Sequence, residues 1–203
     1  MKAVILDNGH GYETPGKRSP EWLDMPQVRE WEYARRLVKS VSEALDGMGI
    51  TNLLLVPENY DVNLAERCRR ANLAAYEYGV HDTLLVSVHL NAAPKVNQAS
   101  GWEIHTYLGK SDSDRYATVF WEQADMILSP CGIRMRGDWS DGDPDWDTNL
   151  AILRDTVCPA VLTENLFMNS ESDCRFLNSE DGFRKLVQVH AAAIAEIFGM
   201  ETD

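Results

Sequence analysis

Five short apolar segments recur along the chain, separated by longer segments in which apolar and polar positions follow a helical period. The first and third segments are almost entirely apolar, which is typical of strands buried on both faces of a parallel sheet. We therefore expect strands over residues 3–7, 52–57, 83–89, 101–107 and 160–165.

Four of the longer segments predict helices, because their apolar residues recur every three or four positions. In the first, these positions run from Tyr33 to Leu45, and glycines follow. Asn63 is a candidate cap for the second helix and Asp112 for the third. The predicted helices span residues 28–49, 63–79, 112–130 and 179–199.

Strands that alternate with helices indicate βαβ units. The sequence thus predicts an α/β fold of the phosphorylase/hydrolase-like kind, with a mixed, mostly parallel sheet and helices on both faces. A chain of 203 residues without an internal repeat or linker fits one domain over residues 1–203.

The formal net charge of −13 narrows the expected partners. Without a basic stripe to neutralise phosphates, no nucleic acid is expected to bind. No run of 18 apolar residues occurs, so we expect no membrane insertion. We also expect a monomer. The first apolar run, Ala3 to Leu6, is too short for a secretory signal peptide, which predicts synthesis in the cytoplasm.

The cysteines and an acidic loop add smaller predictions. The four cysteines lack a CxxC pair, so we expect reduced, mostly buried thiols rather than a cysteine zinc site. Residues 134–149 are rich in aspartate, which predicts a long exposed connection. Trp139 and Trp146 in this loop either line a substrate groove or fold the loop onto the domain.

Polar residues gather where the predicted strands end. Open parallel sheets bind ligands at the carboxyl ends of their strands. His10 follows the first strand between two glycines, His89 ends the third strand, and Glu164 ends the fifth. Because these ends share one edge of the sheet, we expect the three side chains to lie close together.

Glu30 joins this set through the spacing of the first helix. It lies on the same helix face as Tyr33, Leu37 and Val41, whereas Glu32 is displaced from that face by roughly 200°. We therefore expect Glu30 to point to the sheet edge and Glu32 to point to solvent. The alternative for Glu30 is a carboxylate that serves the helix dipole alone.

His10, Glu30 and His89 have the composition of a catalytic zinc site, in which three protein ligands leave a fourth position for water. Zinc lowers the pKa of such a water molecule and polarises a carbonyl. On this interpretation the chain holds one Zn²⁺ ion, and Glu164 is either a carboxylate that contacts a metal ligand or the catalytic general base.

Three further residues have two or more interpretations each. Glu103 either orients a ligand histidine or faces water. Arg154 either binds a substrate carboxylate, steadies Glu164 or lies on the surface. Asn91 either holds its loop or touches substrate. The other histidines are expected to be a sheet-face His105, a solvated His81 and a partly buried, structural His190.

Several segments follow one another in a characteristic order: VILDNGHG, a glutamate that opens a helix, RRAN, VSVHLNA, GWEIHTY and LAILRDTVCPAVLTENLFMNSESDCRFL. This order resembles the zinc-dependent N-acetylmuramoyl-L-alanine amidases, the amidase-3 type of peptidoglycan hydrolase. The resemblance extends from Leu6 to the last helix. It implies that His10, Glu30 and His89 are the zinc ligands and that Glu164 is the catalytic glutamate.

The chain departs from the pattern of that family around the site rather than in it. Asn165 and Leu166 stand where the family has Thr-Gly after the catalytic glutamate, and Tyr12 stands where a second glycine is common. The segment 17–30 is distinctive. We expect these departures to change the pocket wall and the peptide specificity, not the reaction.

The resemblance implies hydrolysis of the amide bond between N-acetylmuramic acid and L-alanine in peptidoglycan. Two alternatives stay open: a zinc peptidase or carboxypeptidase that acts on the stem peptides, and a non-catalytic wall-binding module. The expected setting is a phage or prophage lysis enzyme that reaches the cell wall after release. A cytoplasmic enzyme that acts on wall fragments is the alternative setting.

Overall fold

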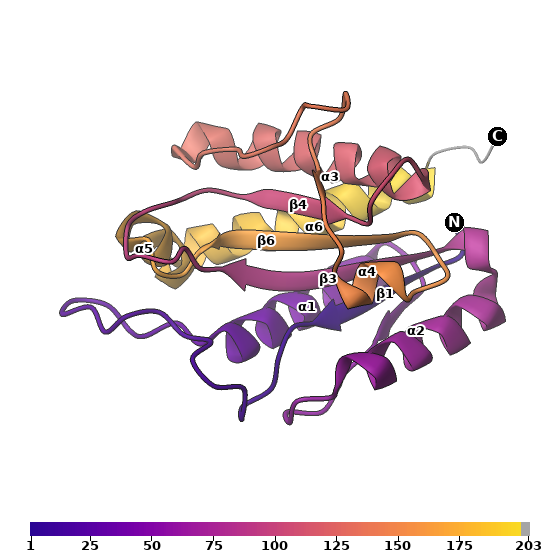
Figure 1. Ribbon diagram of the computed structural model, residues 1–203, viewed down its shortest axis with the longest axis horizontal. Coiled ribbons are helices and arrows are strands. Elements are labelled where there is room, and N and C mark those ends of the chain that lie inside the picture. Colours follow the sequence, from indigo (N-terminus) through magenta and orange to yellow (C-terminus); the bar gives the residue numbers. More distant parts are fainter. Residues whose placement is uncertain (200–203) are drawn as a thin grey trace.

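A mixed sheet forms the centre of the computed structural model, which describes residues 1–199 (Figure 1). Its strand order is β2-β1-β3-β6-β4-β5, and all neighbouring strands are parallel except the antiparallel pair β4 and β6. The strands are β1 (Ala3–Asn8), β2 (Asn52–Leu54), β3 (Thr83–Asn91), β4 (Glu103–Thr106), β5 (Trp146–Asp147) and β6 (Ala160–Phe167). The predicted α/β fold with a mostly parallel sheet is confirmed.

The four long predicted helices are present, together with two short helices that the sequence pattern did not indicate. The helices are α1 (Glu30–Gly47), α2 (Leu64–Tyr78), α3 (Asp112–Leu128), α4 (Ala151–Arg154), α5 (Glu171–Asn178) and α6 (Glu180–Gly199). Asn63 caps α2 as predicted, by accepting a hydrogen bond from Glu66 N. The cap of α3 is Ser111 and not Asp112, because Ser111 and Asp114 form a reciprocal capping box.

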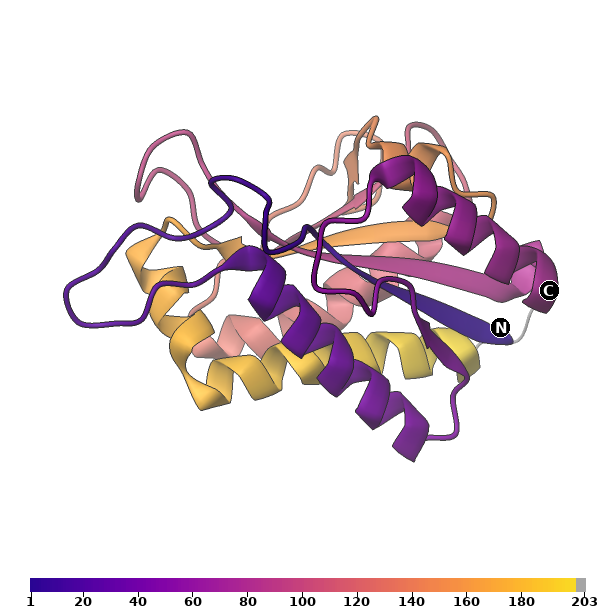
Figure 2. The same ribbon diagram turned by 90° about the horizontal axis from the view of Figure 1, so that it is seen from below.

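Helices cover both faces of the sheet, as predicted. Figure 2 shows α1, α3 and α6 on one side of the sheet and α2 with α4 on the other. The larger core lies on the first side and includes Val4 and Leu6 of β1, whereas Ile5 faces the smaller core under α2. Every residue of β1 is buried, which explains the uninterrupted apolar run from Ala3 to Leu6 that begins it.

The register between β3 and β6 shifts at the end of the sheet that carries the candidate site. His89 pairs with Glu164, but Asn91 pairs with Phe167, so β6 contains one extra residue. This is a β-bulge, a feature that often redirects side chains beside functional sites. Leu166 lies in the bulge with a φ of 73°, a conformation that glycine adopts far more readily than leucine.

The acidic segment 134–149 is less exposed than predicted. It contains the edge strand β5, and Asp145 in it is buried and accepts a hydrogen bond from Thr106 Oγ1. The rings of Trp139 and Trp121 make an edge-to-face contact at 5.4 Å between their centroids. This contact corresponds to the alternative in which Trp139 folds the loop onto the domain.

All four cysteines are free thiols in the described part of the chain, and only Cys131 is exposed. Within residues 1–199, no helix is both long enough and apolar enough to span a membrane.

Candidate active site

Two histidines and a glutamate converge at the carboxyl ends of β1 and β3. His10 Nε2 lies 3.3 Å from Glu30 Oε1, and His89 Nδ1 lies 3.1 Å from the same oxygen. One ligand atom from each of the three residues lies within 4.8 Å of the other two. The structure thus brings together the residues that the sequence predicted as metal ligands, which we call the metal trio.

The backbone around His10 is shaped to present its imidazole. His10 itself has a φ of 61°, in the left-handed region that few residues other than glycine adopt. A Cβ atom on Gly9 would lie 2.3 Å from His89 Cε1, and a Cβ on Gly11 would lie 2.1 Å from Asp61 N. The two glycines are therefore needed because a ring on one side and backbone on the other approach them closely.

A buried arginine from α2 holds the loop that carries His10. The Arg67 guanidinium donates hydrogen bonds to the Asp7 carboxylate at 2.6 Å, to Asn8 O at 2.6 Å and to His10 O at 3.3 Å. Ser87 Oγ donates to the other oxygen of Asp7 at 2.6 Å. The end of β1 is thus tied to α2 and β3 by one buried polar network.

Reasoning from the sequence missed Arg67, although the sequence contains a signal for it. Arg67 is four residues before Ala71 and eight before Ala75, and all three lie on the buried face of α2. An arginine on an apolar helix face needs a buried acceptor, and Asp7 at the end of an apolar strand is the matching partner.

Glu30 occupies the position that the helical spacing predicted. It is the first residue of α1 and is buried, whereas Glu32 is exposed. Glu30 Oε1 also accepts a hydrogen bond from Leu90 N at 3.2 Å. Its Oε2 atom is buried without a hydrogen-bond partner among residues 1–199, and Lys17 Nζ lies 3.8 Å from it.

The charges within the metal trio depend on one another. Burial alone would raise the pKa of Glu30, but the hydrogen bonds and charges of His10 and His89 outweigh it and hold that pKa well below its usual range. Burial lowers the pKa of His89, but Glu30 raises it more, so the net change is upward. Two imidazoles and an ionised carboxylate with one buried, unpartnered oxygen are a donor set that fits a divalent metal ion such as zinc.

Glu164 lies beside the metal trio on the neighbouring strand. It pairs in register with His89 of β3 and with Glu103 of β4. Burial and the negative charges of Glu30 and Glu103 raise the pKa of Glu164 to about 8, although His89 and Lys17 act in the opposite direction. A carboxyl group that titrates near neutrality can both accept and donate a proton.

Asn165, one of the departures from the family pattern, fixes the strand end that carries His89. Its Nδ2 donates to His89 O at 3.1 Å and to Thr163 Oγ1 at 3.0 Å. Its Oδ1 accepts a hydrogen bond from Trp102 Nε1 at 2.9 Å. Asn165 is fully buried, so its effect on the site passes through the backbone of His89 and not through the pocket wall.

Glu103 and Asn91 form a polar cluster next to Glu164. Asn91 Nδ2 donates to Glu103 Oε1 at 2.6 Å, and Asn91 Oδ1 accepts from Ala92 N at 2.8 Å. Glu103 also contacts Arg136, and its Oε1 lies 3.3 Å from His105 Nε2. The partners of Glu103 are thus Asn91, Arg136 and His105 and not the predicted ligand histidines, while Asn91 holds its own loop.

Arg154 is bound within its own turn at the end of α4. Its guanidinium donates to both carboxylate oxygens of Asp155 at 2.8 Å and to Asn149 Oδ1 at 2.9 Å. Its side chain is more than one third exposed. This arrangement corresponds to the surface alternative for Arg154.

The remaining histidines lie outside the metal trio. His81 is exposed, as predicted. His105 lies on the face of β4 opposite to the buried Trp102 and Ile104. His190 is fully buried, more than predicted, between Thr163 Oγ1 at 3.0 Å and Leu186 O at 2.8 Å.

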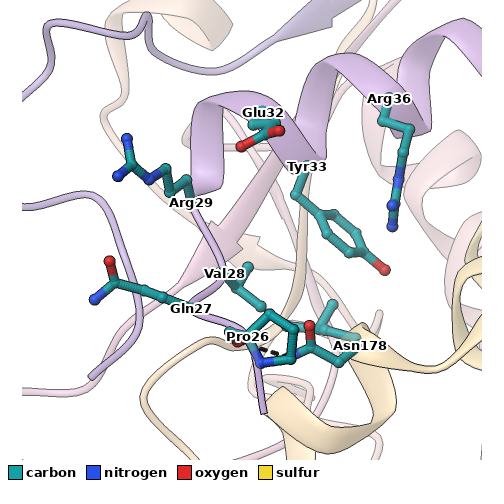
Figure 3. A pocket seen from close by; sticks show the side chains of 9 residues that line it. Pro26, Gln27, Val28, Arg29, Glu32, Tyr33, Arg36 and Asn178 are labelled. Atoms are coloured by element: carbon teal, nitrogen blue, oxygen red, sulfur yellow. Dashed lines mark hydrogen bonds between the residues drawn. The ribbon is translucent and has the colours of Figure 1, made fainter. Parts of the chain in front are cut away.

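One pocket is lined by two members of the metal trio. A pocket of about 260 Å³ opens beside His10 and His89 and is also lined by Leu64 and Ile152. A larger pocket of about 370 Å³ lies where the start of α1 meets the end of α5 and contains no member of the metal trio (Figure 3). The smaller pocket is therefore the one with access to the candidate metal site.

The fold and the site together have the features of a single α/β domain with a candidate metal centre. The chain belongs to the amidase-3 family of N-acetylmuramoyl-L-alanine amidases, whose sequence model matches residues 4–196.

Two named proteins are similar to this chain in sequence. The chain is 29% identical to the endolysin of Bacillus phage SPP1 over 205 residues, which covers 98% of this chain and 67% of that protein. It is 26% identical over 201 residues to the N-acetylmuramoyl-L-alanine amidase CwlM of Bacillus licheniformis, with 98% and 70% covered.

Solved structures show the same fold at lower identity. An N-acetylmuramoyl-L-alanine amidase from Clostridium difficile 630 matches with a TM-score of 0.82 and 22% identity, and the match covers 98% of each chain. The catalytic domain of CwlV from Bacillus (Paenibacillus) polymyxa var. colistinus matches with a TM-score of 0.80 and 21% identity, over 99% of this chain and 100% of that domain.

Proposed function

We propose that this chain hydrolyses the amide bond between N-acetylmuramic acid and L-alanine in peptidoglycan, with one zinc ion held by His10, Glu30 and His89. The observation that carries the proposal is the convergence of these three side chains beside Glu164, in a chain of the N-acetylmuramoyl-L-alanine amidase family. A module that only binds the cell wall would not need Glu164, a buried carboxyl group with a raised pKa, next to the candidate metal site.

When bound, zinc supplies a Lewis acid for the scissile carbonyl and lowers the pKa of water. Glu164 moves the protons in this proposal: it takes one from the attacking water and delivers it to the departing amide nitrogen. Burial raises the pKa of Glu164 above its ordinary value, and a cation held by the metal trio would lower it again, so that the group could be ionised before the attack and protonated afterwards.

The residues around the metal trio act by fixing positions. Arg67 and Asp7 hold the backbone of His10, and Asn165 holds the backbone of His89. Such restraint keeps the ligands and Glu164 in one geometry before substrate binds, which lowers the reorganisation needed during the reaction. Glu30 contributes a fixed charge at the start of α1.

We further propose that the chain acts on the cell wall after release from the cytoplasm, as a lysis enzyme does. Its similarity to the endolysin of Bacillus phage SPP1 supports this setting. Peptidoglycan is the proposed partner, and the acidic character of the chain gives no support for nucleic acid as a partner.

The test is mass spectrometry of purified peptidoglycan after digestion by the zinc-loaded protein, by the chelated protein and by Glu164→Gln. We expect free stem peptides that begin with L-alanine, together with peptide-free glycan, from the zinc-loaded protein alone. Glu164→Gln should retain zinc but lose at least about 100-fold in rate, the scale of one general acid–base group.

Other products would refute specific parts of the proposal. Cleavage inside the stem peptides would identify a peptidase instead of an amidase. Undiminished turnover by Glu164→Gln would remove Glu164 from the proton-transfer role.

A further inference from the structure

A separate pocket lies beside the metal trio, under the loop that leads from β1 to α1. Its volume is about 310 Å³. Its lining includes Tyr12, Lys17, Arg18, Arg29 and Trp31. Lys17 connects this pocket with the metal trio, because it lines the pocket and its Nζ lies 3.8 Å from Glu30 Oε2. Figure 2 shows the indigo loop projecting next to the start of α1.

Two arginines in this pocket lie directly opposite each other across an antiparallel bridge, Arg18 with Arg29. Backbone hydrogen bonds flank the bridge, from Glu30 N to Lys17 O at 3.0 Å and from Ser19 N to Val28 O at 2.8 Å. This pattern makes Arg18 and Arg29 a non-hydrogen-bonded pair, in which the Cα atoms are about 4.5 Å apart and the side chains are closest. Like charges placed opposite each other in this way destabilise the pairing.

Within residues 1–199, no carboxylate forms an ion pair with either arginine. Neither the Arg18 nor the Arg29 guanidinium has a hydrogen-bond acceptor or a carboxylate partner there, although most arginines of the chain do. The only carboxylate in the pocket lining is Glu13, and its Oε2 accepts a hydrogen bond from Asp61 N. Arg29 also lines the neighbouring pocket, where Figure 3 shows its side chain directed away from Tyr33 and Asn178.

A local excess of positive charge in a chain with a net charge of −13 indicates an anionic ligand. In the proposed substrate the sugars are neutral and the lactyl carboxyl group is consumed in the amide bond. Free carboxylates therefore belong to the stem peptide. Arginine suits them because its planar guanidinium can donate two parallel hydrogen bonds to one carboxylate.

We propose that Arg18 and Arg29 bind a free carboxylate on the stem-peptide residue that follows L-alanine, and that they make this carboxylate a determinant of specificity. The inference rests on the proposed function. One extended residue spans at most about 3.6 Å, so a peptide whose first amide lies at the metal trio brings its next residue to the pocket that Lys17 shares. Tyr12 and Trp31 supply aromatic surface beside the same position.

The test uses two soluble substrates, N-acetylmuramoyl-L-Ala-γ-D-Glu-L-Lys and its D-isoglutamine counterpart, both with an amidated C terminus. They differ only in one carboxylate that becomes a carboxamide. We expect kcat/KM of the zinc-loaded protein to be about tenfold higher for the carboxylate substrate, the scale of one charge-assisted hydrogen bond. Arg18→Gln and Arg29→Gln should each bring this ratio close to one, chiefly through KM.

The matched control is Arg184→Gln, which removes an exposed arginine that pairs with Asp181 on α6 and should keep the tenfold ratio. Calorimetric binding of the two product peptides should show the same preference without turnover. Thermal unfolding of each variant verifies that it is folded.

The outcomes distinguish a failure of this inference from a failure of the proposed amidase function. Equal kcat/KM values for the two substrates in the wild type, or an undiminished preference in both arginine variants, overturn the inference while hydrolysis itself persists. Failure of the wild type to cleave either substrate overturns the proposed function and this inference with it.

Discussion

Two residues of the site adopt backbone conformations that most side chains avoid. His10 and Leu166 have φ values of 61° and 73°. The left-handed conformation costs a residue with a Cβ roughly 1–2 kcal/mol. At His10 the conformation accompanies an imidazole that reaches Glu30, and at Leu166 it accompanies the bulge that follows Glu164. Local strain is thus concentrated where the proposed ligands and catalytic group are placed.

Leu166 offers a direct test of this strain. Its side chain is fully buried in the larger core, so Leu166→Ala should cost about 2–5 kcal/mol of the free energy of unfolding. Glycine is normally worse than alanine within a strand by about 0.5–1 kcal/mol. Here we expect the reverse order, with Leu166→Gly more stable than Leu166→Ala by about 1 kcal/mol, because glycine tolerates the positive φ. Urea unfolding of both variants measures the order, and the normal order would show that position 166 carries no strain.

At the scale of secondary-structure elements, single polar side chains join helices to the strands that end at the site. Arg67 of α2 joins the end of β1, and His190 of α6 joins Thr163 of β6. Both side chains are buried, so each depends on its partners to satisfy its polar atoms. These contacts determine how two helices are positioned relative to the strands that carry His10 and Glu164.

The contact between Arg67 of α2 and Asp7 of β1 predicts a large loss of stability on substitution of Arg67, which a second substitution at Asp7 partly restores. Arg67→Met leaves the Asp7 carboxylate buried without its cation, so we expect a loss of about 3–5 kcal/mol in the free energy of unfolding. The double variant Asp7→Asn/Arg67→Met should recover part of that loss, because the uncompensated charge is then absent. Denaturant unfolding compares the two, and a loss below about 1 kcal/mol in the single variant would contradict the assigned role.

The contact between α6 and β6 predicts a pH dependence of stability. Burial lowers the pKa of His190 to about 4, while the histidine of the unfolded chain has a pKa near 6.5. Between these values the unfolded state binds a proton that the folded state does not, so stability falls as pH falls from 6.5 to 4.

The variant His190→Gln removes this titration. Its free energy of unfolding should fall between pH 7 and pH 4.5 by about 2 kcal/mol less than that of the wild type, measured by urea unfolding at both values. His81→Gln, which replaces an exposed histidine, is the matched control. Parallel pH profiles for the wild type and His190→Gln would refute the assignment.

At the scale of the whole molecule, the apolar pattern predicted five of the six strands and the four long helices, and the strand ends that it marked led to His10 and His89. It succeeded with Glu30 because a helical period separates it from Glu32 by a large angle. It missed β5, α4 and α5, which are too short to show a period. It also missed Arg67 and the bulge at Leu166, because both depend on pairings between residues far apart in the sequence.

The metal trio is assembled from residues at positions 10, 30 and 89, which lie in the loop after β1, at the start of α1 and in β3. Only the folded chain brings these three ligands together, so the affinity for the metal depends on correct folding. The central claim is that His10, Glu30 and His89 hold one zinc ion at this place.

The most direct measurement is the zinc content of the purified wild type, Glu30→Gln and Glu32→Gln by inductively coupled plasma mass spectrometry. The two glutamates are two residues apart on α1, but one is buried in the trio and the other is exposed. The account predicts one zinc ion per chain in the wild type and in Glu32→Gln, and little zinc in folded Glu30→Gln. Full zinc in Glu30→Gln, or its loss in Glu32→Gln, would contradict the account.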